Sequence, residues 1–308
     1  MNISLHQLRV FMAVVEKESV SRAAEELHMT QPAVSIQLKN LQEQFELPLT
    51  EVISRRTYIT DFGREVYAAA TRILEEVDGL DQHAGRFKGL LTGRLSLAVA
   101  STGKYVMPYY LRDFLRAHPD VNLSMDVTNK ARVVRSLENN EVDFALVSVL
   151  PEKLEIEQEV LLPNPLFLTC GQAIRPPGKG LRDRSLFKEI PLIYREDGSG
   201  TRFAMQRYFQ RANIVPRVRL ELTSTEAVKQ AVIAGLGYSI LSLLSIRNEL
   251  QQKQIRIVPV KGLPLVENWR LVWLARKQLP LAAKAFLDHV RKEKEAVYRE
   301  QFSWMEKY

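Results

Sequence analysis

Two short segments of the chain combine hydroxyls, glycines and a cation in a way that suits the binding of an anion. They read Ser101-Thr102-Gly103-Lys104 and Gly198-Ser199-Gly200-Thr201-Arg202, and each follows a predicted strand and precedes a predicted helix. Free backbone N–H groups and the positive end of a helix dipole favour an anion at such a junction. Taken alone, each segment is better explained by helix capping. Ligands of open α/β sheets bind beyond the carboxyl ends of the strands, so the joint placement of the two segments favours one shared cleft.

The residues expected to bind this anion also include two polar side chains on neighbouring elements. Asn129 precedes the predicted helix from Lys130 to Asn139, and Ser148 lies at the end of the predicted strand from Val142 to Val149. The residues predicted to bind the anion are Ser101, Thr102, Lys104, Asn129, Ser148, Ser199, Thr201 and Arg202. Neither a metal nor a cofactor nor catalysis is expected, because the five histidines show no metal-ligand spacing and no nucleophile elbow or Walker-type loop occurs.

A second set of residues, between Ser21 and Phe45, is suited to reading DNA. Ala23, Ala24 and Leu27 form an apolar face at helical spacing, and a break follows before a new helix that Thr30 would cap, with Pro32 in its first turn. Four apolar side chains of this new helix recur at spacings of four, three and four: Val34, Leu38, Leu41 and Phe45. The opposite face is polar, as in a helix whose first residues enter the major groove, although an ordinary helical hairpin would show the same pattern.

The DNA contacts expected from this pattern fall into two kinds. Base edges would be read by amides and hydroxyls at the start of the second helix, and phosphates would be bound by nearby cations. The segment from Val52 to Thr60 alternates polar and β-branched residues, which predicts a two-stranded wing that carries two arginines at its tip. The predicted DNA-binding residues are Arg22, Thr30, Gln31, Pro32, Ser35, Lys39, Arg55 and Arg56.

The same stretch resembles the N-terminal domain of LysR-type transcriptional regulators. The residues that carry the resemblance are Phe11, Ser19, Ser21-Arg22-Ala23-Ala24, Leu27-His28, Thr30-Gln31-Pro32-Ala33-Val34-Ser35, Leu38, Leu41, Leu47-Pro48-Leu49 and Thr60-Asp61-Phe62-Gly63. Three positions depart from the family pattern, because Ile36, Glu46 and Thr50 stand where the family favours Arg, Gly and Phe. The resemblance implies a sequence-specific regulator that binds double-stranded operator DNA as a homodimer or a homotetramer.

Composition places the chain among compact proteins of a reducing compartment. Hydrophobic residues make up 46% of the 308 residues, and the single cysteine, Cys170, excludes an internal disulfide. The first residues lack the basic and apolar regions of a signal peptide, and no stretch is apolar enough to span a membrane, so we expect a cytoplasmic protein without membrane contact. The net charge of +7 does not itself indicate DNA binding, because residues 1–60 carry a net charge of −1 while residues 165–220 carry +7.

The elements that must position these residues fall into three regions. A winged helix-turn-helix domain is expected over residues 1–60, with a first helix that ends near Glu18. A linker region is expected over residues 61–90, and a helix from about Asp61 to Phe87 within it would run about 40 Å at 1.5 Å per residue. It carries an apolar seam made by Val66, Ala69, Ala70, Ile73, Val77 and Leu80. A solitary helix would expose that seam, so we expect it to be a linker helix that pairs with a second copy.

From residue 91 the pattern changes to alternating strands and helices, which predicts a parallel α/β fold. Helices are expected at Tyr105 to His118, Lys130 to Asn139, Thr201 to Ala212, Thr225 to Ala234 and Leu281 to Arg299. Two crossings, near Leu162 and Glu267, would divide residues 91–308 into a first lobe, 91–162 with 268–308, and a second lobe, 163–267. This arrangement resembles the periplasmic-binding-protein fold that LysR regulators carry as an effector domain.

Both anion-binding segments resemble those of LysR regulators that control carbon-fixation (RuBisCO) operons. The counterparts there read Ser-Thr-Gly-Lys-Tyr and Arg-Glu-X-Gly-Ser-Gly-Thr-Arg, and residues 195–202 of this chain depart little from the second. The resemblance implies an effector that is a phosphorylated metabolite or a nicotinamide cofactor. Two alternatives remain at this point: a cytoplasmic small-molecule-binding protein without DNA binding, which would leave the N-terminal motif unexplained, and an architectural DNA-binding protein, which would need no cleft.

Overall fold

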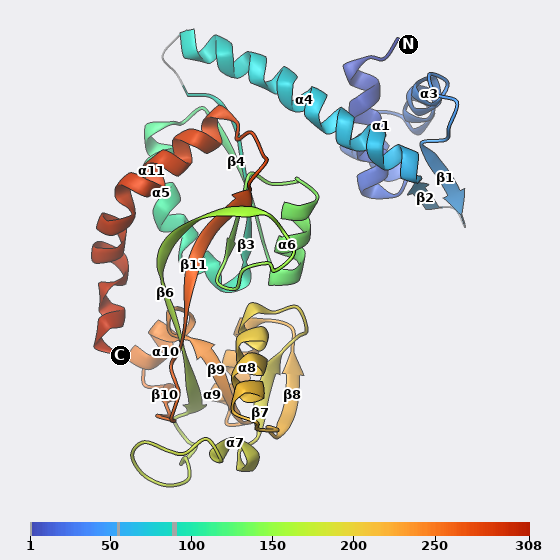
Figure 1. The fold of residues 1–308 in the computed structure, drawn as a ribbon. Helices are drawn as coiled ribbons and strands as arrows, with labels where there is room; N and C mark the ends of the chain where they lie inside the picture. Colours follow the sequence, from blue (N-terminus) through green and yellow to red (C-terminus); the bar gives the residue numbers. More distant parts are fainter. Residues whose placement is uncertain (1, 54–55, 88–90) are drawn as a thin grey trace. The chain divides into compact units, whose positions relative to one another are not determined.

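The computed structural model describes residues 2–53, 56–87 and 91–308, and the chain folds as two compact units, Met1–Gly89 and Leu90–Tyr308. In the first unit three helices pack around a small core (Figure 1). These helices are α1 (Leu5–Lys17), α2 (Val20–Glu26) and α3 (Gln31–Gln42). No helix in the described residues is long and apolar enough to cross a membrane.

Local capping sets where these helices begin. Ser4 starts α1 with a reciprocal pair of hydrogen bonds to Gln7, and the Ser19 hydroxyl accepts a hydrogen bond from the backbone N–H of Arg22 at the start of α2. The Thr30 hydroxyl accepts from the N–H of Ala33, which confirms the predicted cap of α3. The tight turn between α2 and α3 places His28 at a φ of 51°, in the left-handed region. The predicted helix-turn-helix is therefore present.

The wing and the long helix follow α3 directly. Strands β1 (Thr50–Ile53) and β2 (Arg56–Ile59) pair antiparallel, and helix α4 (Asp61–Phe87) begins after Thr60, whose hydroxyl accepts a hydrogen bond from the N–H of Gly63. A side chain at position 63 would not fit, because its Cβ would lie 2.0 Å from the carbonyl oxygen of Leu49. The glycine thus allows α4 to pack closely against the segment that precedes the wing.

The second unit is built on one continuous sheet with helices against its faces (Figure 1). Its strands are β3 (Gly93–Ala100), β4 (Val121–Thr128), β5 (Phe144–Val147), β6 (Ile156–Gly171), β7 (Leu192–Arg195), β8 (Val218–Leu222), β9 (Tyr238–Ser242), β10 (Ile255–Ile257) and β11 (Leu265–Leu274). Its α-helices are α5 (Met107–Ala117), α6 (Lys130–Glu138), α7 (Leu186–Glu189), α8 (Gly200–Arg211), α9 (Thr225–Ile233), α10 (Arg247–Gln251) and α11 (Leu281–Val297).

The strand order divides this unit into two lobes. Neighbouring strands follow the order β4-β3-β5-β11-β6-β9-β7-β8, and β10 pairs with β6 outside this path. We call β3 to β5 with α5, α6 and α11 the first lobe, and β7 to β10 with α7 to α10 the second lobe. Strands within each lobe pair mainly in parallel, whereas β6 and β11 run antiparallel to each other and pass through both lobes. The two long strands are therefore the covalent connections between the lobes.

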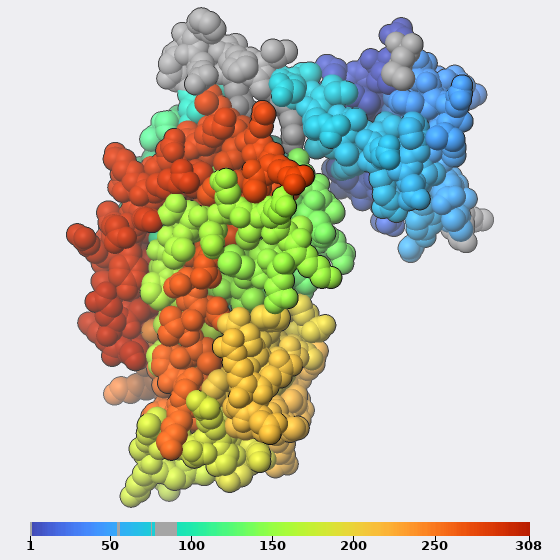
Figure 2. All heavy atoms as spheres, in the orientation of Figure 1, coloured from blue at the N-terminus to red at the C-terminus, as the bar shows by residue number. Residues whose placement is uncertain are grey.

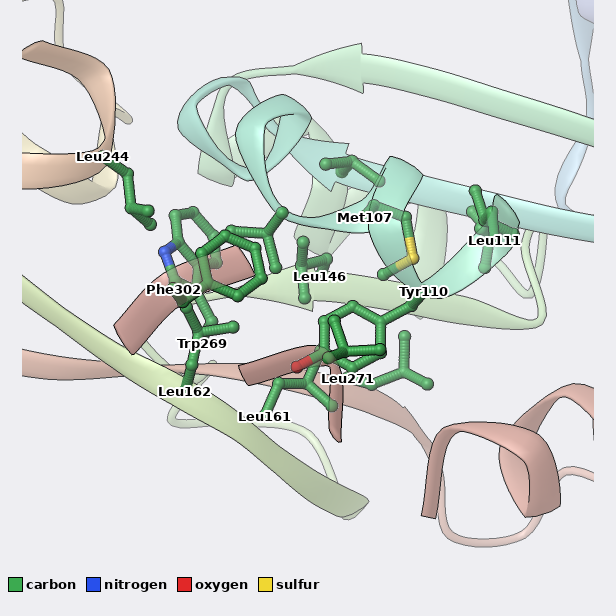
Figure 3. Packing of buried hydrophobic residues seen from close by; sticks show 14 of the residues in the cluster. Met107, Tyr110, Leu111, Leu146, Leu161, Leu162, Leu244, Trp269, Leu271 and Phe302 are labelled. Carbon is green, nitrogen blue, oxygen red and sulfur yellow. The ribbon is translucent and has the colours of Figure 1, made fainter. Parts of the chain in front are cut away.

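A single large apolar cluster continues through this crossing. It joins the first-lobe residues Tyr110 and Phe286 to second-lobe residues such as Val228 and Leu244. Trp269 of β11 is buried where the crossing strands pair, with Leu162 of β6 as its partner in the register. Figure 3 shows Trp269 packed beside Leu162, Leu244 and Phe302. Because this core is shared, the lobes form one packed unit rather than two separately folded bodies.

Several elements differ from the sequence-based expectation. The helix predicted from Tyr105 begins only at Met107, because residues 101–105 form a 3₁₀ helix, η1 (Ser101–Tyr105), and Pro108 lies in the first turn of α5. The first half of β6 was not predicted, since Glu157, Gln158 and Glu159 interrupt the apolar pattern. The final helix ends at Val297 and continues as one π-helical and one 3₁₀ turn rather than as α-helix to Arg299.

Candidate DNA-binding and effector-binding sites

The start of α3 presents a polar surface. Gln31 and Pro32 are exposed, Ser35 is half-buried, and the Gln31 amide donates a hydrogen bond of 3.3 Å to the Ser35 hydroxyl. Val34 and Leu41 on the opposite side are fully buried. Among the predicted DNA-binding residues, Gln31, Pro32 and Ser35 therefore lie together, whereas the Thr30 hydroxyl is already used as the helix cap. Ile36, one of the departures from the family pattern, is 56% exposed and adds an apolar side chain to the same helix.

Three of the predicted phosphate-binding cations are exposed in the structure. Arg22 is exposed at the start of α2, and Arg56 is exposed at the start of β2. The side chain of Lys39 is 75% exposed and makes a loose ion pair of 3.8 Å with Glu43 one turn later. Such an exposed pair contributes little to stability, so Lys39 remains available to a phosphate. Arg55 lies outside the described residues.

The first predicted anion-binding segment lies at the carboxyl end of β3. Its residues form η1, in which Thr102 and Gly103 are buried, Ser101 is half-buried and Lys104 is exposed above the ring of Tyr105. Asn129 precedes α6, where its side-chain oxygen accepts a hydrogen bond of 3.1 Å from the N–H of Arg132. Asn129 therefore acts as a helix cap in this structure, which was the simpler interpretation of its position.

The second predicted segment lies at the start of α8. Ser199 occupies the cap position and is buried, but its hydroxyl makes no capping hydrogen bond. Thr201 is half-buried in the first turn. Arg202 is directed towards its own lobe, where it pairs with Glu221 at 2.6 Å and donates a hydrogen bond to the carbonyl of Arg195. The positive charge of Arg202 is thus already balanced by a carboxylate.

The two lobes touch where α6 and α8 begin. The N–H of Ala131 donates a hydrogen bond of 3.1 Å to the carbonyl of Gly198. A Cβ at Gly200 would lie 3.9 Å from both the Ser148 hydroxyl and Cβ of Lys130. The atoms of these two regions meet in the space-filling view (Figure 2). The structure therefore brings Ser148 of the first lobe close to the glycine-rich start of α8.

Lys130 and Phe203 add a further contact between the lobes. The Lys130 ammonium lies 4.6 Å from the centre of the Phe203 ring. Burial lowers the pKa of Lys130 below its usual value, although Glu152 partly opposes this shift. A partly desolvated cation over an aromatic face is a favourable contact, and it would also attract an anion that entered between the lobes.

Arg195 is a buried cation that the sequence-based site omitted. It is 3% exposed at the end of β7, and one guanidinium nitrogen lies 3.4 Å from the Ser101 hydroxyl of the first lobe. It also donates to the Thr225 hydroxyl at the start of α9 and to the Glu196 carboxylate. Its place at the start of the glycine-rich motif was visible in the sequence, but its contact with Ser101 depends on tertiary structure.

Lys229 is a second buried cation of the second lobe. Its ammonium pairs with Glu226 at 2.8 Å and with Glu249 at 2.6 Å. Burial lowers the pKa of Lys229, but the hydrogen bonds with these two carboxylates outweigh burial and raise it above the usual value. Lys229 also lies near Tyr105 of η1, where it opposes the effect of burial on the pKa of the phenol. Both buried cations therefore face the segment that carries Ser101 and Thr102.

Comparison with known proteins shows which class of protein carries this fold and these surfaces. Residues 5–64 match the family described as "Bacterial regulatory helix-turn-helix protein, lysR family", and residues 88–295 match the "LysR substrate binding domain". The chain belongs to the LysR family of oligomeric, DNA-binding transcriptional regulators, whose activity is modulated by a small metabolite.

Several known proteins that are similar along nearly the whole chain are transcriptional regulators. A "RuBisCO operon transcriptional regulator" of Allochromatium vinosum is 39% identical, over 95% of this chain and 97% of that protein. The "HTH-type transcriptional activator CmpR" of Synechocystis is 37% identical, over 96% of this chain and 97% of that protein. These names describe transcriptional regulators rather than enzymes.

Solved structures show the same fold. The regulatory domain of Synechocystis CcmR in complex with 2-PG is 35% identical with a TM-score of 0.63, and the match covers 66% of this chain and 97% of that domain. A full-length OxyR from Pseudomonas aeruginosa is 21% identical with a TM-score of 0.71, over 94% of this chain and 95% of that chain. The fold predicted from the sequence, a winged helix-turn-helix domain followed by a two-lobed α/β domain, is thereby confirmed.

Proposed function

We propose that this LysR regulator controls a carbon-fixation operon in response to a small phosphorylated acid. The proposal is supported by full-length relatives that are RuBisCO operon regulators and by the similar CcmR domain, which was solved with 2-PG (2-phosphoglycolate). The observation that carries it in this chain is the contact between Arg195 and Ser101, which places a buried cation of one lobe at the hydroxyl-rich segment of the other. An anion bound there would contact both lobes.

The effector site that we propose extends the predicted one. Its core consists of Ser101, Thr102 and Ser199, and we add Arg195, whose guanidinium lies 3.4 Å from the Ser101 hydroxyl. Lys104, Ser148 and Thr201 would line the site, while the Asn129 and Arg202 side chains would support it through their caps and ion pairs. The protein would act as a regulator and not as an enzyme, in the cytoplasm.

The DNA contacts that we propose follow the surface of α3. Gln31, Pro32 and Ser35 would face base edges in the major groove, where amides and hydroxyls distinguish base pairs. The phosphates would be bound by Arg22, Lys39, Arg55 and Arg56, with Thr30 holding the start of the helix. We propose that the DNA-binding domain spans residues 1–60, the linker helix residues 61–90 and the effector domain residues 91–308. We also propose that a dimer forms through the linker helix.

Calorimetric titration with 2-phosphoglycolate tests the effector site. Replacing Thr102 by Val keeps the size of this buried side chain but removes its hydroxyl, so affinity should fall by about tenfold, which corresponds to about 1.4 kcal/mol for a lost hydrogen bond to a charged group. Thr71→Val, in the first unit, is the matched control and should leave the affinity unchanged. Operator binding without effector should be the same in all three proteins. Undiminished affinity of Thr102→Val would remove this hydroxyl from the site.

A further inference from the structure

The guanidinium of Arg195 has a carboxylate partner within its own sequence motif. Glu196 accepts two hydrogen bonds from it, of 2.7 Å at Nε and 2.9 Å at Nη2. The side chain of Arg195 is 3% exposed and that of Glu196 is 15% exposed. A bidentate pair of this kind is a geometry in which arginine frequently binds carboxylates and phosphates. Glu196 therefore occupies the place that an effector anion would take on this guanidinium.

The remaining contacts of Arg195 are neutral. Its Nη1 donates to the Thr225 hydroxyl, and its Nη2 also approaches the Ser101 hydroxyl at 3.4 Å. Among the described residues, Glu196 is the only carboxylate that pairs with Arg195. A buried cation without a counter-ion is strongly unfavourable, so the pair keeps Arg195 compensated while no effector is bound.

We propose that Glu196 is an internal competitor for the effector, which an incoming anion must displace from Arg195. This inference rests on the effector site proposed above and adds a rule for its ligands. A monocarboxylate would only replace one carboxylate by another and would gain little. A ligand that carries two or more negative charges, such as a phosphate monoester with a carboxylate, can displace Glu196 and still contact a further cation, for example Lys104 at the exposed end of η1. Displacing Glu196 costs every ligand the same free energy, so Glu196 would set a threshold that multiply charged metabolites exceed and simple acids do not.

The test is a calorimetric titration of the full-length protein and of Glu196→Gln with 2-phosphoglycolate, inorganic phosphate and glycolate. Gln keeps the length of the side chain but removes its charge, so Arg195 is left without a counter-ion until an anion binds. We expect all three affinities to rise, by about tenfold or more, which corresponds to about 1.4 kcal/mol. Glycolate, which the original protein should bind weakly, should show measurable binding to the variant.

Asp197→Asn is the matched control. It removes the same charge one residue further along, from a carboxylate that is 92% exposed and lies 3.9 Å from Arg202. Affinities that stay unchanged in Asp197→Asn but rise in Glu196→Gln support the proposal. An equal rise in both variants would mean that only the overall charge matters, and a fall in Glu196→Gln would mean that Glu196 positions Arg195 for the ligand; either result overturns it.

Two further measurements keep the test decisive. Glu196→Asp retains the charge but is too short for the same bidentate contact, so it should give a smaller rise in affinity. It replaces Glu196→Gln as the test variant if that protein proves unstable in thermal unfolding. If the original protein binds none of the three ligands, the proposed effector class is wrong. The competition between Glu196 and an anion for Arg195 is still tested in that case. Inorganic phosphate should bind to Glu196→Gln or to Glu196→Asp more tightly than to the original protein. Unchanged phosphate binding would refute the competition.

Discussion

At the scale of single residues, the DNA-binding surface separates side chains that read bases from side chains that bind phosphates. Gln31 is exposed at the start of α3, whereas Lys39 projects two turns later beside Glu43. Gln31→Ala should weaken binding to the operator by about 1–3 kcal/mol and leave binding to unrelated DNA almost unchanged. Lys39→Ala should weaken both and reduce the dependence on salt.

Gel-shift titrations with the operator and with a scrambled duplex at two salt concentrations measure this difference. Asn40→Ala, an exposed polar position on the same helix outside the proposed reading edge, is the control and should behave like the original protein. If Gln31→Ala kept both its operator affinity and its sequence preference, α3 would not enter the groove through its first turn.

The local role of a side chain at a helix start could be predicted better than its contacts with distant parts of the chain. The cap by Thr30 depends on residues three apart in the chain, so the sequence was sufficient to identify it. The role of Arg202 could not be predicted in this way, because Glu221, its carboxylate partner, arrives from β8 by tertiary packing. Arg195 was missed for the same reason, since Ser101 lies 94 positions away in the chain.

At the scale of elements, α4 uses its apolar seam in two ways. Val66 and Leu74 pack with buried Ala70 against the core that α1 and α3 form, so this part of the seam is covered within the chain. Ile73 remains 46% exposed. Part of the predicted seam is therefore covered within the chain, and part is exposed. Leu80 lies outside the part of α4 whose side chains the structure describes. The exposed face around Ile73 is the surface that we propose for pairing with a second copy.

Ile73→Glu should therefore dissociate the dimer, because it would bury a charge without a counter-ion at the interface. Sedimentation velocity over a range of concentrations measures the loss. Ala68→Glu places the same charge at an exposed position away from the seam and should leave the oligomer intact. An Ile73→Glu protein that is folded and sediments like the original would place the dimer contact on another element.

Elements that local sequence signals define were predicted well. A strand that is defined by its pairing with another strand was predicted poorly. The helix-turn-helix has a cap, a proline and a regular apolar spacing, and all three act within one or two turns. The first half of β6 has no such signal, because its polar residues become a strand only through their antiparallel pairing with β11. Sequence patterns describe single elements, whereas this strand is stabilised by a neighbour more than 100 residues away.

At the scale of the whole effector unit, the lobes share the strands β6 and β11 and meet again at the starts of α6 and α8. The strands act as the fixed connection, and the hydrogen bond from Ala131 to Gly198 joins the lobes on the side where the effector is proposed to bind. A ligand that contacts both lobes would favour the arrangement in which they touch, and a coupling of about 1–3 kcal/mol is typical of such regulation. The contact at Gly198 is therefore the place to test this linkage.

Gly198→Ala should weaken the contact between the lobes for a steric reason, because its Cβ would lie 2.8 Å from Cβ of Ala131. Gly198 also has a φ of 81°, so the substitution adds backbone strain of about 1–2 kcal/mol. Gly178→Ala is the matched control, since its φ is 69° and no atom lies within 4 Å of the new Cβ. We expect calorimetry to show effector affinity lowered about tenfold, corresponding to about 1.4 kcal/mol, in Gly198→Ala only, with operator binding unchanged in both variants. Ala131→Gly should then restore part of the lost affinity in the double variant, because it removes the clashing methyl group; a double variant as weak as Gly198→Ala would assign the loss to backbone strain rather than to contact between the lobes.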